Sequence, residues 1–235
     1  MYQISVNIKT LTPVVFSEKS GDTVLTATKD YFTGSAIRGA LAQKYIRGKA
    51  IDCPVEDAEF CDLFLSGKIS FLPAYISEKI NEANSVAEPL PSTLVLSKMK
   101  NEKKEKEFKD MLALKEGEKV GAGFKPLKGF GVIVPADVND KSKGNLVYRT
   151  SVNKAIELHM SRSSEDERRM GRSDDGGIYN YEALQAGQSF TGYLEGSEED
   201  LQKLLIALKD AGFDQKGYVY FGRSKNTQYG TCYIE

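Results

Sequence analysis

The densest set of side chains able to hold an anion lies close to the C-terminus, in the segment Gly222–Gly230 (GRSKNTQYG). Two glycines bound the segment, Arg223 and Lys225 supply positive charge, and there is no acidic residue. Glycine lets the backbone approach a ligand, successive free N–H groups can form an anion nest, and cations neutralise phosphates. The pattern predicts a phosphate contact, with a solvated hairpin turn as the alternative. The predicted contact residues are Gly222, Arg223, Ser224, Lys225, Asn226, Gln228, Tyr229 and Gly230.

A second anion-binding pattern occurs where Thr33-Gly34-Ser35 precedes an apolar helical stripe. The N-terminus of a helix has free N–H groups and a positive dipole end, so it is suited to a phosphate. Arg38 would lie in the first turn and add a cation. The predicted contact residues are therefore Gly34, Ser35 and Arg38, and the alternative is an ordinary helix capped by Ser35 or Thr33.

Candidates for acid–base catalysis are few. His159 is the only histidine, and an Arg-rich charged stretch follows it. A general acid or base in a ribonuclease is one interpretation, but a single His without an evident partner more often makes an ordinary polar contact. Asp22 and Asp30 precede the predicted helix, and a lone acid is weak evidence for cleavage. The absence of a base–acid pair favours binding over chemistry.

No metal or cofactor is expected. Cys53 and Cys61 are eight residues apart, which is wider than the usual spacing of zinc ligands. Cys232 and His159 would be needed to complete a four-ligand site, so we predict none.

The elements that must position these residues follow from hydrophobic periodicity. Period-two alternation predicts a strand at the N-terminus, and apolar residues on one helical face follow the Gly34-Ser35 turn, with Gly48 as the predicted helix end. A second strand, helix and strand occur near the C-terminus, where Ser197 and Asp200 form a capping box and Gly212 ends the helix. Two such halves predict an α+β, ferredoxin-like (RRM-type) fold. Further strands are predicted at 68–75, 132–134, 188–195, 218–221 and 231–234.

The chain of 235 residues is interpreted as one domain, 1–235, with insertions near 81–110 and 161–177. Both stretches are polar and charged. The net charge of −1 excludes a global basic field, so nucleic-acid binding requires local patches. No leader sequence or membrane-spanning segment is apparent, and we expect a cytoplasmic location.

Both anion-binding motifs carry a family resemblance. The segment 31–42 (YFTGSAIRGALA) resembles the "(I/F)PGSSLRGALR" segment of the RAMP superfamily of CRISPR-associated proteins, with Thr33 in place of the family's Pro. The segment 221–230 resembles that superfamily's C-terminal glycine-rich loop. Other segments resemble those of a type III-D member of the superfamily, the Csx-ten family, and occur in the same order along the chain. That family is similar to the subunit that binds the 5′ tag of the crRNA. The matching segments are 61–64 before 69–71, 91–93 leading to Lys98, and 187–192.

The resemblance implies an RNA-binding, non-catalytic subunit of a type III effector complex. Such a subunit would hold the guide crRNA, at its 5′ tag, and dock to the large subunit and the backbone subunits, with no membrane partner. It implies that His159 borders a loop near RNA. Base stacking is an option for Tyr31, Tyr218, Tyr220 and Tyr229, although core packing is the favoured interpretation for most of them. The alternative function is a RAMP endoribonuclease, or a target-RNA-cleaving backbone subunit, that uses Asp22 or His159.

Overall fold

A computed structural model describes most of the chain, in two compact units. The first unit comprises Met1–Ser77 and Val152–Glu235, and the second comprises Glu78–Ser151. Asp22 and Asn226 lie outside the described residues. The described residues are 1–18, 25–80, 83–99, 108–115, 118–121, 123–135, 145–160, 165–170, 177–214, 216–225 and 228–235.

The main sheet of the first unit confirms the predicted α+β, ferredoxin-like fold. Its strands run in the order β16-β17-β1-β15-β5, so each strand–helix–strand half interleaves with the other. Neighbouring strands in this order are antiparallel. The bounds are β1 (Tyr2–Thr10), β5 (Tyr75–Ile80), β15 (Ser189–Gly196), β16 (Gly217–Tyr220) and β17 (Thr231–Ile234), with β4 (Ser70–Phe71) also paired to β15.

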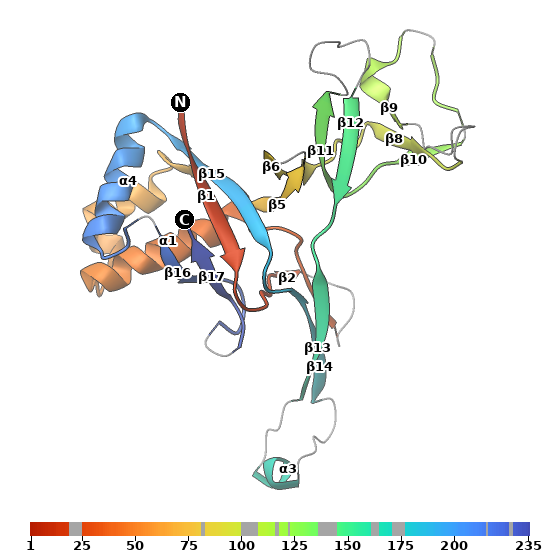
Figure 1. Ribbon diagram of the computed structural model, residues 1–235. Helices are drawn as coiled ribbons and strands as arrows, with labels where there is room; N and C mark the ends of the chain where they lie inside the picture. Colours follow the sequence, from red (N-terminus) through yellow and green to blue (C-terminus); the bar gives the residue numbers. More distant parts are fainter. Residues whose placement is uncertain are drawn as a thin grey trace. The chain divides into compact units, whose positions relative to one another are not determined.

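Helices α1 (Gly34–Lys49) and α4 (Glu198–Asp210) cover one face of this sheet (Figure 1). Ser197 caps α4 by accepting a hydrogen bond from the N–H of Asp200, as the capping box predicts. Helix α1 does not end at Gly48 as expected; it continues to Lys49. A Cβ at Gly48 would lie 1.9 Å from the carbonyl oxygen of Ala211, so this glycine allows α1 to approach the end of α4 closely.

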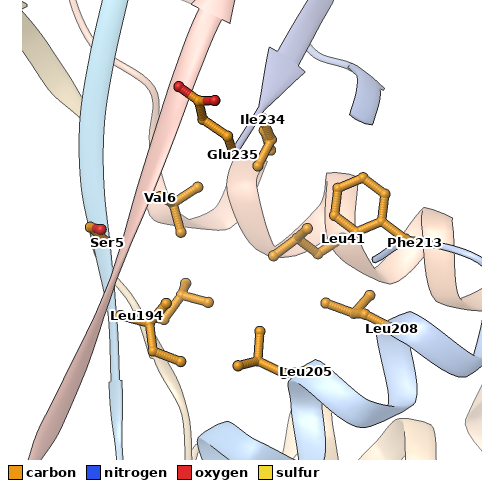
Figure 2. A pocket seen from close by; sticks show the side chains of 10 residues that line it. Ser5, Val6, Leu41, Leu194, Leu205, Leu208, Phe213, Ile234 and Glu235 are labelled. Carbon is orange, nitrogen blue, oxygen red and sulfur yellow. The ribbon is translucent and has the colours of Figure 1, made fainter. Parts of the chain in front are cut away.

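The space between sheet and helices holds the core and one small apolar hollow of about 120 Å³ (Figure 2). Val6 and Leu194 line it from the sheet, and Leu41 and Leu208 line it from the helices. Because its walls are almost entirely hydrocarbon, they offer no set of polar groups to orient a polar ligand. We attribute this hollow to packing between the layers.

A second sheet in the first unit is formed by β13 (Lys154–Met160), β14 (Ile178–Leu184), β3 (Leu25–Thr28) and β2 (Ser17–Glu18), in that order. Strands β13 and β14 form an antiparallel pair. The charged stretch 161–177, expected as a loop, connects them and includes the short helix α3 (Glu165–Met170).

The expected strand over 68–75 is interrupted. Pro73 has no N–H to donate to a ladder, and the chain breaks there into β4 and β5. At the break, Phe32 and Ala74 exchange backbone hydrogen bonds of 3.0 and 2.9 Å, which ties the start of α1 to the sheet. Between α1 and β4 lie the short helical segments η1 (Pro54–Glu56), α2 (Ala58–Phe60) and η2 (Cys61–Leu65).

The second unit contains the first insertion but is larger than the predicted 81–110 and has strands of its own. It holds two three-stranded sheets, β10-β8-β9 and β12-β11-β7. None of the helices described in either unit is long and apolar enough to cross a bilayer. The bounds are β6 (Ala83–Val86), β7 (Glu88–Pro89), β8 (Leu94–Ser97), β9 (Phe108–Asp110), η3 (Met111–Ala113), β10 (Phe124–Pro126), β11 (Phe130–Pro135) and β12 (Asn145–Thr150).

Candidate nucleic-acid interface

The two predicted anion-binding motifs meet in one hollow of about 520 Å³ on the first unit. Ser35 lines the hollow from the start of α1, and Gly222 and Arg223 line it from the glycine-rich loop between β16 and β17. Lys29 adds a second cation. The hollow therefore combines a helix N-terminus with two positive side chains, and the lining residues are Val15, Phe16, Ser17, Lys29, Thr33, Ser35, Gly222 and Arg223.

The helix start at this hollow is electrostatically suited to an anion. Thr33 is the N-cap, and its hydroxyl accepts a hydrogen bond from the N–H of Ala36 at 3.2 Å. The first turn of α1 contains no acidic residue, whereas the first turn of α4 contains three. Acids in the first turn compensate the positive end of a helix dipole. At α1 no acidic side chain in the first turn offsets that positive end.

Gly34 has a packing role at the start of α1. A Cβ at this position would lie 1.8 Å from the backbone oxygen of Phe71. The missing side chain lets the helix start rest directly on the backbone of the β4–β5 connection. The adjacent Ser35 is exposed, and its hydroxyl lies 3.1 Å from that of Thr33.

The glycine-rich loop is held by backbone hydrogen bonds to the segment after β1. The N–H of Arg223 donates to the carbonyl of Val15 at 2.9 Å, and the N–H of Gly230 donates to that of Pro13 at 2.8 Å. These two N–H groups are occupied, so they do not form part of the anion nest that the glycines predict.

Aromatic rings support both cations of the hollow. The guanidinium of Arg223 lies over the ring of Tyr181, 5.5 Å from its centroid. The ammonium of Lys29 lies 5.8 Å from the ring centroid of Tyr31. Such contacts restrict the orientations of both cationic side chains.

Tyr229 joins the loop to the β13–β14 hairpin. Its ring is 1% exposed and packs with Val15 and Tyr181. Its hydroxyl donates to the carboxylate of Glu157 and lies 2.5 Å from Nε2 of His159. Because the single hydroxyl proton goes to Glu157, the oxygen accepts from His159, which places a proton on Nε2. The ring of His159 stacks on Tyr179 with centroids 5.4 Å apart.

These contacts give His159 and Tyr229 a role in positioning the loop. Tyr229 packs in the core, the favoured interpretation of its sequence position, and its buried ring is not exposed for base stacking. His159 lies beside the loop through its contact with Tyr229. Gln228 makes a further contact from the loop to the hairpin, with its amide nitrogen 3.4 Å from Glu157.

We expect Tyr229→Phe to lower the free energy of unfolding by about 1–3 kcal/mol at neutral pH, because Glu157 and His159 lose a buried partner. Urea unfolding followed by circular dichroism measures this. Burial and the hydrogen bond to Glu157 raise the pKa of Tyr229 to about 12. The phenol keeps its proton in the folded state but loses it above pH ~10 when unfolded.

The difference in unfolding free energy between wild type and Tyr229→Phe is therefore complete below pH ~10 and shrinks as pH rises toward ~12. Other groups with raised pKa values, such as Tyr45 and Cys232, titrate in both proteins and cancel in the difference. A difference in stability that stays constant across this range would contradict the assignment to the phenol.

Several sequence candidates lie outside the lining of the hollow, among them Arg38, Lys225 and Asp30. Arg38 is exposed further along α1, and Lys225 is half-buried with its Cβ near Gly230. Asp30 forms an ion pair with Lys154 at 2.5 Å. Burial alone would lower the pKa of Lys154, but hydrogen bonds to Asp30 and Glu182 outweigh it and raise that pKa.

Lys29 was not singled out by the sequence patterns, although it lies four residues before the helix cap. A lone Lys after a strand carries little signal. Only β2 and β3, which pair antiparallel, position it beside Phe16, whose carbonyl accepts a hydrogen bond from the N–H of Lys29 at 3.1 Å.

A family model for the RAMP superfamily matches residues 7–233, which include both motifs and the interleaved strands. The chain belongs to the RAMP superfamily. A search of curated proteins finds no match.

Solved structures similar to this RAMP protein include a chain of the type III-B Cmr-beta complex in the apo state. It has a TM-score of 0.52 and 12% identity, and the match covers 100% of this chain and 96% of that chain. A chain of the type III-B Cmr-beta complex bound to cognate target RNA has a TM-score of 0.52 and 11% identity, with coverage of 100% and 97%. At this identity the likeness concerns the fold.

Proposed function

We propose that this RAMP protein is an RNA-binding subunit of a CRISPR effector complex and that it holds a guide-RNA phosphate in the hollow between α1 and the glycine-rich loop. The observation that carries the proposal is the convergence of Lys29, Arg223 and the acid-free start of α1 on one hollow. Phosphates bind where backbone N–H groups and cations converge.

Family membership and the setting of similar chains support the same function. Both similar chains belong to type III-B Cmr-beta complexes, one of them bound to cognate target RNA. A near-neutral chain with one local cationic site is suited to a subunit whose neighbours supply the remaining affinity. The sequence resemblance to the type III-D family narrows the proposed role to the 5′ tag of the crRNA, beside the large and backbone subunits.

We also propose that the chain holds RNA without cutting it. His159 has its Nε2 engaged by Tyr229, and Asp30 is paired with Lys154. Both residues are thus committed to contacts that stabilise the fold. A general base needs access to the hydroxyl or water that it deprotonates.

The decisive experiment measures RNA affinity against salt for the double variant Lys29→Gln, Arg223→Gln. Each phosphate contact on a single strand contributes about 0.7 to the slope of log K against log salt, so we expect the slope to fall by up to ~1.4 for all RNA sequences. The matched control is Lys203→Gln, Lys209→Gln on α4, which removes the same charge from exposed positions away from the hollow. An equal fall in both double variants would contradict a specific site.

The same preparation tests catalysis. We expect labelled guide and target RNA to remain intact with and without Mg²⁺. Cleavage at a defined position that His159→Ala or Asp22→Ala abolishes would instead establish the endoribonuclease alternative.

A further inference from the structure

The outer face of the main sheet carries exposed aromatic rings on the strands that flank the glycine-rich loop. Along β16 the side chains alternate, with Val219 buried against the helices and Tyr218 and Tyr220 outward. Tyr218 is 59% exposed and Tyr220 is 40% exposed. Exposed single tyrosines are ordinary, but here the register brings further rings and a cation to the same place.

The register of the sheet puts Tyr218, Tyr233 and Lys9 in one row across β16, β17 and β1. The rings of Tyr218 and Tyr233 meet edge to face, with centroids 5.6 Å apart and an interplanar angle of 78°. Cys232 and Ile234 on β17 point to the core, so Tyr233 points to the outer face. Lys9 is exposed on the same face by the alternation of β1.

Strand β16, which carries Tyr218 and Tyr220, leads directly into the glycine-rich loop. Tyr220 precedes Gly222 by two residues, a reach of at most about 7 Å along the chain. In the register, Tyr220 pairs with Thr231 at the loop end of the two strands. The acidic Glu195 of this face lies away from that end, where it bonds to Gln3 across the far part of β1.

We propose that Tyr218, Tyr220 and Tyr233 form a platform on which the unstacked bases of single-stranded RNA lie, next to the phosphate held at the loop. Every base has a π-face, so such a platform binds single strands with little sequence preference. Lys9 in the same row offers a cation to the backbone of the strand. The platform rests on the proposed function, because it extends the RNA path from the glycine-rich loop over β16 and β17.

The chain contains no tryptophan, so Tyr218→Trp introduces a single fluorescent ring at the platform while conserving an aromatic surface. The probe is a short single-stranded RNA, compared with the same RNA carrying abasic sites. We expect quenching by the intact strand and much less by the abasic strand. The control is Tyr2→Trp, which is 56% exposed at the opposite end of β1 and belongs to the other face by alternation. It should remain unquenched.

Affinity supplies the second measurement. Tyr218→Leu with Tyr220→Leu keeps apolar, strand-compatible side chains but removes two stacking surfaces. Because each ring supplies a stacking surface for a base, we expect RNA binding to weaken at least about tenfold with an unchanged salt slope. Circular dichroism should show that the variants are folded, since both positions are exposed.

The outcomes separate this platform from the proposed function. The platform alone is overturned if the salt slope of RNA binding depends on Lys29 and Arg223, but RNA does not quench Tyr218→Trp and the leucine variant binds with unchanged affinity. That result would leave this face to a protein partner. No RNA binding by the wild-type chain overturns both.

Discussion

Gly34→Ala is expected to lower the free energy of unfolding by more than about 3 kcal/mol, because an added Cβ would lie 1.8 Å from the backbone oxygen of Phe71. No rotamer can relieve an overlap with backbone. The start of α1 would have to move away from the β4–β5 connection, breaking its packing and displacing Ser35 from the hollow. Urea unfolding measures the loss in stability, and RNA titration of the folded fraction measures the loss in binding.

The matched control lies in the same helix. Gly39 is exposed, and a Cβ there would meet nothing within 4 Å. Alanine is the better helix former, so Gly39→Ala should raise stability by about 0.5–1 kcal/mol. Similar losses for both variants would show that the contact of Gly34 with Phe71 does not determine the cost.

Gly222→Ala, in the glycine-rich loop, is the second substitution from which we expect a large loss of stability or of RNA binding. Gly222 has φ +74°, a left-handed conformation that costs roughly 1–2 kcal/mol for a residue with a Cβ. Its Cβ would also lie 2.3 Å from the carbonyl oxygen of Val15, the same oxygen that accepts the N–H of Arg223. The substitution therefore combines strain with overlap and displaces Arg223. We expect a loss of more than about 3 kcal/mol, or a displaced loop with the RNA salt slope reduced as in Arg223→Gln.

Gly187→Ala separates the two causes. Gly187 has φ +86°, but a Cβ there would meet nothing within 4 Å. This variant should lose only the roughly 1–2 kcal/mol of backbone strain and keep wild-type RNA binding. If Gly222→Ala loses no more than Gly187→Ala in both measurements, close packing of the loop on Val15 does not hold Arg223 in place.

Local patterns predict the regular elements well where one face is buried. Alternation along β1 and the helical stripe of α4 with its Ser197 cap are visible in the sequence because each residue's environment repeats with the period of the element. The prediction fails where a distant partner decides. Gly48 resembles a helix end but is a contact point with Ala211, and Ala74, after the break at Pro73, pairs with the distant Phe32.

The strands of the second unit are also decided by distant partners. The stretch 81–109 is polar and charged, which predicts a loop, yet Leu94–Ser97 pairs with both β9 and β10. Short strands in polar sequence have little periodicity to detect. Hydrogen bonds to neighbours along the sheet define them instead.

The class of fold follows from the sequence alone, and two anion-binding motifs are predicted from it, because caps, glycines and hydrophobic periods act over a few residues. The fold brings both motifs to one hollow with Lys29, and it buries Tyr229 while Tyr218 faces outward. In the folded chain, the N–H of Arg223 donates a hydrogen bond to the carbonyl of Val15. The interleaved sheet joins segments that are distant in the chain. The partner of each side chain therefore depends on register and layer rather than on its neighbours in sequence.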